Sequence, residues 1–213
     1  MSALDDAEML KAALQYANYG WPVFPLHTPV KGGCSCRKPD CRDVGKHPRT
    51  RNGLTDATAD EKQIRAWWAM WPTANIGIAC GASGLVVLDV DPRHSGDESY
   101  RDLVAKFGAE AFATRTALTG GGGEHRVFLS PREPTIRNSA GLLAHGLDIR
   151  GEGGFIVAPP SLHASGRRYE WEDADVPALP FPAVLIALLG AARKQREEST
   201  PGAAIPEGER NST

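Results

Sequence analysis

The apolar run that begins at Leu85 constrains the fold of this chain most, because apolar residues alternate with acids at its end, in Leu88-Asp89-Val90-Asp91. Successive side chains of a strand point to opposite faces of its sheet. Val86, Leu88 and Val90 are therefore predicted to face a core. Asp89 and Asp91 share the opposite face with Val87.

Further strands and helices are predicted around this run. Short apolar or alternating segments bounded by glycine, proline or polar residues predict strands at 21–26, 75–79, 114–118, 125–129, 147–149 and 155–158. Apolar stripes predict helices at 2–18, 58–71, 95–107 and from about 185, the second and third opened by capping boxes at Thr58 and Ser95. This order favours an α+β fold around a central sheet. Residues 1–190 are predicted to form one domain, and 191–213, rich in polar residues, a linker toward a missing C-terminal region.

Charge and composition exclude some classes of protein. The net charge of −2 over 213 residues excludes a general polycation, so any nucleic-acid surface must be local. The first residues carry acids where a secretory signal carries bases, and we find no apolar stretch of the roughly 20 residues that a membrane span needs. We therefore expect a cytoplasmic protein with no membrane partner.

The two acids of the Leu85 strand have the spacing of a two-metal site. Two residues along a strand rise about 6.6 Å, so both carboxylates can reach a pair of ions roughly 3.5–4 Å apart. An isolated Asp-x-Asp is more often a strand that ends in solvated acids, here before Pro92. Alone, Asp89 and Asp91 therefore indicate metal binding only weakly.

Two later segments strengthen the indication. Gly120–Gly123 come shortly before His125, and such backbone can approach a phosphate closely while a nearby histidine hydrogen-bonds it. Asp148 lies on a second apolar strand and could add a third carboxylate. A lone histidine is more often structural, so the order of acid pair, glycine run with histidine, and third acid carries the functional interpretation.

These motifs resemble the bifunctional primase-polymerase (Prim-Pol) domains of the archaeo-eukaryotic primase superfamily, which plasmids, phages and integrated elements often carry. The resemblance covers nearly all of residues 8–172. It rests on Asp89 and Asp91, on His125 within Gly-Gly-Glu-His, and on Asp148 within Leu-Asp-Ile-Arg. The flanking matches are Gly45-Lys46-His47-Pro48, Ala158-Pro159-Pro160-Ser161, Tyr169 and Trp171.

The resemblance implies template-directed nucleotidyl transfer by a DNA primase and polymerase. Asp89, Asp91 and Asp148 would hold Mg²⁺ or Mn²⁺, and His125 would contact the triphosphate of a dNTP or NTP. It also implies an RRM-like catalytic sheet packed with an N-terminal αβ unit. DNA template and primer would be partners, and the tail at 205–213 would lead toward a helical or helicase region, so this chain is expected to extend primers more readily than it starts strands.

Two basic residues join this expected nucleotide site. Arg150 is predicted on the same face as Asp148 and is a candidate phosphate contact, although a plain salt bridge to a nearby acid is about as frequent an outcome. Lys46, in the Gly-Lys-His-Pro segment, is a second candidate contact for the triphosphate.

The loop from His27 to Gly53 is expected to bind a structural zinc ion. It has no apolar period, and a loop of this length usually has a function or a staple. Its three thiols and one imidazole are a ligand set that Zn²⁺ accepts: Cys34, Cys36, Cys41 and His47. Because cysteines one residue apart fit one small site poorly, His27 could replace Cys34 or Cys36, and free thiols without metal are the alternative. The separate Cys80 is expected to be a buried apolar residue.

The same loop is strongly basic. Its cations are Lys31, Arg37, Lys38, Arg42, Lys46, Arg49 and Arg51. A charge run is usually a solvated face, but beside an acidic catalytic site it is a natural place for template or primer phosphates.

Two other functions remain open on the sequence. A phosphodiesterase or nuclease could use the same carboxylates with water as the nucleophile. A non-catalytic RRM-like module would bind single strands on exposed aromatic residues. The acids of the Leu85 strand argue against that module, because they would repel phosphate unless metal ions intervene.

Overall fold

The computed structural model describes residues 3–199, which form two main sheets and four α-helices. The helices are α1 (Ala3–Asn18), α2 (Glu61–Met70), α3 (Gly96–Phe107) and α4 (Ala183–Ser199). The α+β prediction is therefore confirmed. None of the helices described is long and apolar enough to cross a membrane.

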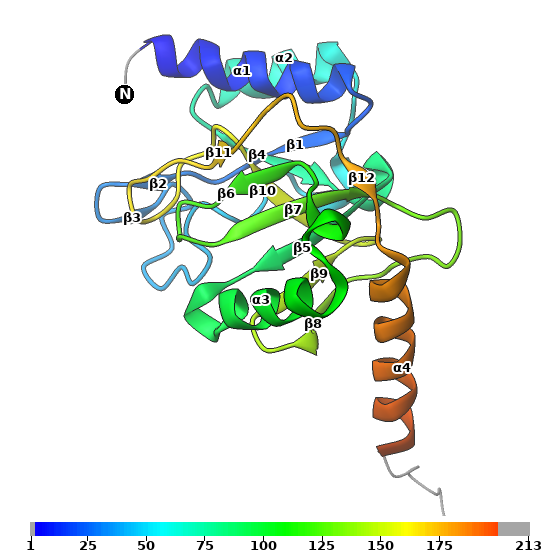
Figure 1. The fold of residues 1–213 in the computed structure, drawn as a ribbon. Helices are drawn as coiled ribbons and strands as arrows, with labels where there is room; N and C mark the ends of the chain where they lie inside the picture. Colours follow the sequence, from blue (N-terminus) through cyan, green and yellow to red (C-terminus); the bar gives the residue numbers. More distant parts are fainter. Residues whose placement is uncertain (1–2, 200–213) are drawn as a thin grey trace, which may run out of the picture.

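The small sheet is antiparallel and has the order β1-β4-β10. Its strands are β1 (Val23–Leu26), β4 (Asn75–Ala79) and β10 (Phe155–Ala158). A separate hairpin pairs β2 (Pro29–Val30) with β3 (Gly33–Cys34) at the start of the cysteine loop. Figure 1 shows α1 and α2 side by side over this part of the molecule.

The large sheet has seven strands and carries the predicted acids. Its order is β11-β6-β7-β5-β9-β8, and β12 adds to β7 as the parallel strand of an otherwise antiparallel sheet. The strands are β5 (Leu85–Val90), β6 (Thr116–Leu118), β7 (Glu124–Leu129), β8 (Ser139–Ala144), β9 (Leu147–Arg150), β11 (Glu170–Trp171) and β12 (Leu179–Pro180). Four short 3-10 turns are η1 (Gly53–Asp56), η2 (Gly81–Ser83), η3 (Pro92–His94) and η4 (Ala109–Phe112).

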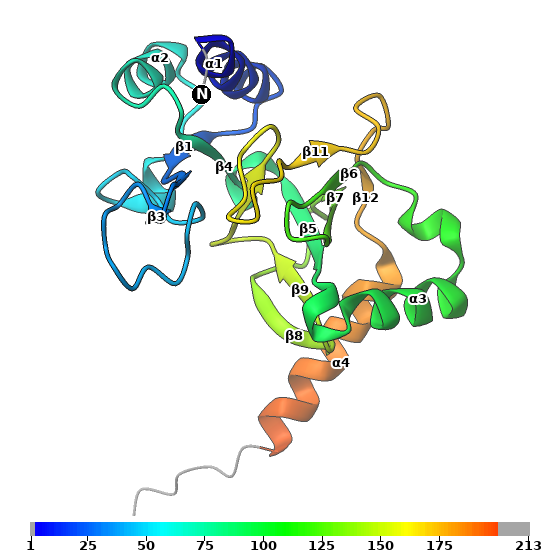
Figure 2. The ribbon, with the colours of Figure 1, turned by 90° about the vertical axis from the view of Figure 1, so that its left-hand side faces the viewer.

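Strand β5 is buried on both faces of the large sheet. Val86, Leu88 and Val90 pack into a core with residues of α3 and α4, as the alternation predicts. Val87 points to the other face and is fully buried in a second core with α1, α2 and the small sheet. Figure 2 shows α3 and α4 on one side of this sheet and α1 and α2 at the far end of the molecule. Only the end of β5, at Asp89, emerges from these cores.

Several boundaries differ from the sequence predictions. Helix α2 is capped by Asp60, whose carboxylate accepts a hydrogen bond from Lys62 N, instead of by Thr58. Ser95 precedes α3 in a left-handed conformation and its hydroxyl caps nothing. Strand β8 was missed because its Ser-Ala-Gly start lacks apolar alternation.

Helix α4 continues to Ser199, beyond the predicted linker boundary at 190. The segment from 191 to 199 is therefore helical in the structure, and residues 200–213 lie outside the described part of the chain. Cys80 is fully buried, as expected.

Candidate active site

The centre of the site is a row of side chains across three strands of the large sheet. Asp89 on β5 is paired in register with His125 on β7 and with Asp148 on β9. Residues directly opposite one another on adjacent strands point to the same face of a sheet. The three residues, which lie far apart in the sequence, therefore meet at the exposed end of β5.

Arg150 joins the two carboxylates of this row. Its Nη2 lies 2.8 Å from Asp148 Oδ2 and 3.1 Å from Asp89 Oδ2. The other oxygen of Asp148 accepts a hydrogen bond of 2.9 Å from Gly141 N. The salt-bridge alternative for Arg150 is thus present in the structure, and a contact of Arg150 with phosphate stays a prediction.

Asp91 lies just beyond β5 and has a partner of its own. Its carboxylate accepts a hydrogen bond from Arg93 N at 3.0 Å and forms a salt bridge with the Arg93 guanidinium at 2.7 Å. Hydrogen bonding by Arg93 holds the pKa of Asp91 below its usual value. Within residues 3–199, Asp89, Asp91 and Asp148 do not form a group whose ligand atoms all lie within 4.8 Å of one another.

His125 is the buried member of the row. It is 7% exposed, and its ring packs against Tyr169 with ring centroids 5.9 Å apart. Nε2 lies 3.7 Å from Asp89 Oδ1, and Nδ1 is buried without a hydrogen-bond partner in the described residues. Burial lowers the pKa of His125 and so favours the neutral imidazole, although the nearby charge of Asp89 acts in the opposite direction.

A cleft of about 330 Å³ opens over this row and contains every residue predicted for catalysis and nucleotide binding. The predicted members among its lining residues are Lys46, Asp89, Asp91, His125, Asp148 and Arg150. A second chamber of about 430 Å³ shares Lys46, Asp89 and Arg150 with it and continues toward His47 and Phe155. The cleft therefore extends from the carboxylates to the cysteine loop.

The glycine run forms one wall of the cleft, where Gly121 and Gly123 line it. A side chain at Gly123 would collide with the carbonyl oxygen of Val90, and one at Gly120 would collide with His163. Glycine is thus required here for close packing of the chain against β5. An approach of this backbone to phosphate stays a prediction.

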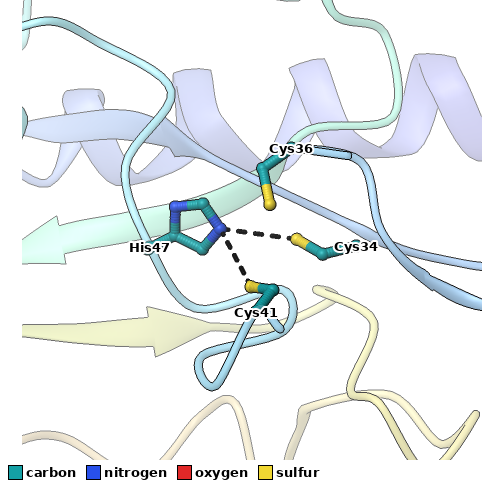
Figure 3. A group of neighbouring side chains, drawn as sticks. All are labelled: Cys34, Cys36, Cys41 and His47. Atoms are coloured by element: carbon teal, nitrogen blue, oxygen red, sulfur yellow. Dashed lines mark hydrogen bonds between the residues drawn. The ribbon is translucent and has the colours of Figure 1, made fainter. Parts of the chain in front are cut away.

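The cysteine loop brings its four predicted ligands together (Figure 3). The ligand atoms of Cys34, Cys36, Cys41 and His47 all lie within 4.8 Å of one another. His47 Nε2 lies 3.4 Å from Cys34 Sγ and 3.5 Å from Cys41 Sγ. A tetrahedral zinc ion with bonds of about 2.3 Å to sulfur and 2.0 Å to nitrogen places these atoms roughly 3.6 Å apart. The cluster could therefore hold zinc.

His27 does not belong to this group, so the suggestion that it replaces Cys34 or Cys36 is not supported by the structure. Its Nδ1 lies 2.9 Å from Ser35 Oγ, and its ring stacks on that of His47 at 4.4 Å. The β2–β3 hairpin ends at Cys34, and the chain then turns back, with Arg37 N donating a hydrogen bond of 2.9 Å to Cys34 O. This turn lets both thiols face His47, which sequence spacing alone did not reveal.

The family model for bifunctional DNA primase/polymerase, N-terminal (Prim-Pol) matches residues 13–184. The chain belongs to this family. The match spans both sheets, the cysteine loop and the whole cleft of this Prim-Pol domain. Among curated proteins, the comparison found no match.

The cleft of the Prim-Pol domain also contains residues that the sequence reasoning missed. Arg93, His94, His145 and His163 line it. His163 follows the Ala-Pro-Pro-Ser segment that carries part of the family resemblance, so its position near that motif was an available signal. His145 lies in the turn between β8 and β9, and no motif of the sequence indicated that this turn reaches the site.

The basic residues of the loop have different roles in the Prim-Pol domain. Lys46 lines the cleft. Arg49 is half-buried and donates to Leu26 O at 3.1 Å and to Ser35 Oγ at 2.8 Å. Arg49 therefore ties the cysteine loop to β1, and its guanidinium is already occupied within the fold.

Proposed function

We propose that this Prim-Pol domain catalyses template-directed nucleotidyl transfer, as a DNA primase and polymerase, by a two-metal mechanism. The observation that carries the proposal is the placement of Asp89 between Asp148 and His125 on the floor of a cleft. Family membership supports primase and polymerase chemistry of this kind. Asp89, Asp91 and Asp148 are the proposed metal ligands.

The carboxylates fit a divalent cation by their chemistry. Asp89 and Asp148 project from adjacent strands, and their side chains are only 22% and 28% exposed. Two such neighbouring acids attract a cation, as their shared contact with Arg150 illustrates. Carboxylate oxygen is the ligand that Mg²⁺ and Mn²⁺ prefer. When bound, such ions would activate a 3′ hydroxyl and neutralise the leaving pyrophosphate.

The other residues of the cleft would hold the nucleotide. His125, Lys46 and Arg150 surround the carboxylates and supply hydrogen-bond donors or positive charge for the triphosphate of a dNTP or NTP. The buried, uncharged His125 would keep its ring fixed against Tyr169 while it contacts phosphate. The role of these residues is to orient the phosphates for in-line attack.

We propose a structural role for zinc at Cys34, Cys36, Cys41 and His47. The neighbour of His47 in the chain is Lys46, which lines the cleft, so the metal would fix one wall of the nucleotide site. The exposed cations of the loop, Arg37, Lys38 and Arg42 among them, are proposed to contact template and primer phosphates.

The biological setting is also a proposal. The resemblance favours replication of a plasmid, phage or integrated element in the cytoplasm, with a helical or helicase region downstream of residue 213 as a partner. The predicted tail segment lies outside the described residues. A comparison of this chain with a longer one in unprimed synthesis tests the dependence on that region.

Primer extension with labelled dNTPs on a primed template, in Mg²⁺ and in Mn²⁺, tests the function. We expect incorporation by the wild type, and loss of it in Asp89→Asn and Asp148→Asn. Asp102→Asn, at an exposed position of α3, is the matched control and should extend as the wild type does. Primer shortening would identify a nuclease, and binding of DNA without either reaction would identify a non-catalytic module.

A further inference from the structure

The turn of residues 163–167, which follows β10, is fixed against the glycine wall of the cleft. Ser165 Oγ donates a hydrogen bond of 2.7 Å to Gly120 O, and Arg167 Nε donates one of 3.0 Å to the same oxygen. A side chain at residue 120 would collide with His163. The absence of a side chain at Gly120 therefore lets this turn, which we call the histidine turn, close onto the cleft.

The local contacts of His163 determine which of its ring nitrogens carries the proton. The backbone N–H of Ser165 donates to His163 Nδ1 at 3.1 Å. Ser165 Oγ also lies 3.0 Å from Nδ1. Because a backbone N–H can only donate, its contact favours an unprotonated Nδ1, and we assign the hydrogen of the neutral ring to Nε2. Nε2 lies 3.6 Å from the position that a Cβ of Gly121 would occupy, and both residues line the cleft. His163 thus provides a hydrogen-bond donor beside the glycine wall.

Positive charge gathers around this donor. Burial lowers the pKa of His163, and the positive charges of Lys46, Arg93 and Arg167 lower it further. Lys46 and Arg93 line the cleft, and an Nη atom of Arg167 lies 3.5 Å from the Cβ position of Gly122. Arg93 pairs with Asp91, whereas the hydrogen bond from Arg167 Nε goes to an uncharged carbonyl. Such a concentration of cations in one corner favours a bound anion.

We propose that the histidine turn, Lys46 and the glycine wall form a binding site for the terminal phosphates of the incoming nucleotide, with His163 donating from Nε2. This inference rests on the proposed function, which places a nucleoside triphosphate in the cleft. It adds a second phosphate-binding histidine, because the rings of His163 and His125 both pack on Tyr169. Because the corner opens into the cleft that contains the proposed metal ligands, we assign its anion to the polyphosphate of a nucleotide, and titration with DNA tests the DNA backbone as the other source.

Calorimetric titration tests the proposal, with Ca²⁺ in place of Mg²⁺ to prevent turnover. The ligands are a dNTP, the matching dNMP, inorganic tripolyphosphate and a short single-stranded DNA. For His163→Ala we expect affinity for dNTP and tripolyphosphate to fall about 10-fold or more, the effect of losing a hydrogen bond to a charged group. Affinity for dNMP and for DNA should stay within threefold.

Two further variants make the result specific. His163→Gln can still donate from its side-chain amide and should restore most of the tripolyphosphate affinity. Arg101→Ala removes an exposed cation from α3, outside the cleft, and should leave all four affinities unchanged. If His163→Ala fails to fold, as judged by circular dichroism, His163→Gln and Arg167→Gln provide the comparison, with only the latter expected to weaken tripolyphosphate.

An equal loss for dNMP and dNTP, no loss in His163→Ala, or a loss confined to DNA would overturn the inference. Failure of the proposed function looks different. Binding of dNTP that depends on His163 without incorporation into primed DNA supports this phosphate site and refutes only the polymerase assignment. Incorporation by the wild type, with unchanged tripolyphosphate binding in His163→Ala, refutes only the phosphate site.

Discussion

Asp89→Asn should separate catalysis from stability in this Prim-Pol domain. The substitution keeps the shape of the side chain and removes its charge. It removes the salt bridge of Asp89 with Arg150 at 3.1 Å, but Arg150 retains its salt bridge with Asp148 at 2.8 Å. It also relieves repulsion between two acids on adjacent strands. Because these two effects oppose each other, we expect the free energy of unfolding to change by less than about 1 kcal/mol.

The effect on catalysis should be far larger. Loss of one group that stabilises transition-state charge typically costs about 10²–10³ in rate, and loss of a metal ligand also weakens the ion itself. We therefore expect incorporation to fall at least about 10³-fold, which corresponds to roughly 4 kcal/mol in activation free energy. The melting temperature should move by no more than about 2–4 °C, since 1 kcal/mol has this effect in a chain of such length.

The assay pairs single-turnover primer extension with thermal melting in the absence of divalent ions. Extension within tenfold of the wild-type rate would show that Asp89 is not a metal ligand. A large fall in melting temperature together with lost activity would show that Asp89 serves the fold instead. Asp102→Asn, exposed on α3, controls for the loss of an acid as such.

Three further predictions concern the cysteine loop, the glycine wall and the dependence of stability on pH. Protein purified without added metal should contain about one zinc ion per chain by elemental analysis, and chelation should speed tryptic cleavage between Lys31 and Arg51; zinc-free protein with an equally resistant loop would contradict the site. Gly123→Ala should destabilise the fold by about 1–3 kcal/mol in denaturant unfolding, because its Cβ meets Val90 O, whereas Gly190→Ala meets no atom within 4 Å and should be neutral or stabilising. Burial, with Arg49, lowers the pKa of His27 to about 4 in the folded protein. Between about pH 6.5 and 4 the unfolded chain therefore binds one more proton than the folded chain, and the free energy of unfolding should fall as the pH drops through this range. An equally steep fall in His27→Gln would assign this loss of stability to other groups.

Local patterns in the sequence were sufficient to predict most helices and strands. The alternation after Leu85 predicted which side chains of β5 are buried with α3 and α4, and Val87 was correctly placed on the other face. Helix α4 was predicted to end too early, because its last turns are polar and resemble a linker when read without their neighbours. A polar helix that continues from a docked apolar segment does not need a buried face of its own.

The family motifs likewise selected residues that the fold brings together, and their roles as metal and nucleotide ligands stay predictions. Asp89, Asp91, His125 and Asp148 all line one cleft, as the resemblance implied. The structure also brings together the four predicted ligands of the cysteine loop, including the pair Cys34 and Cys36 that spacing alone made doubtful.

What only the tertiary structure decided is which of these residues are neighbours. The period of a strand fixes the face of each side chain, but the partner across the sheet depends on strand order and register, which long-range packing sets. Asp89 meets Asp148 and His125 because β5 lies between β9 and β7. His163 reaches the cleft because Gly120 leaves room for its turn. No local pattern around residue 163 contains that contact, since the two segments approach each other only when the sheet and the following turn have packed together.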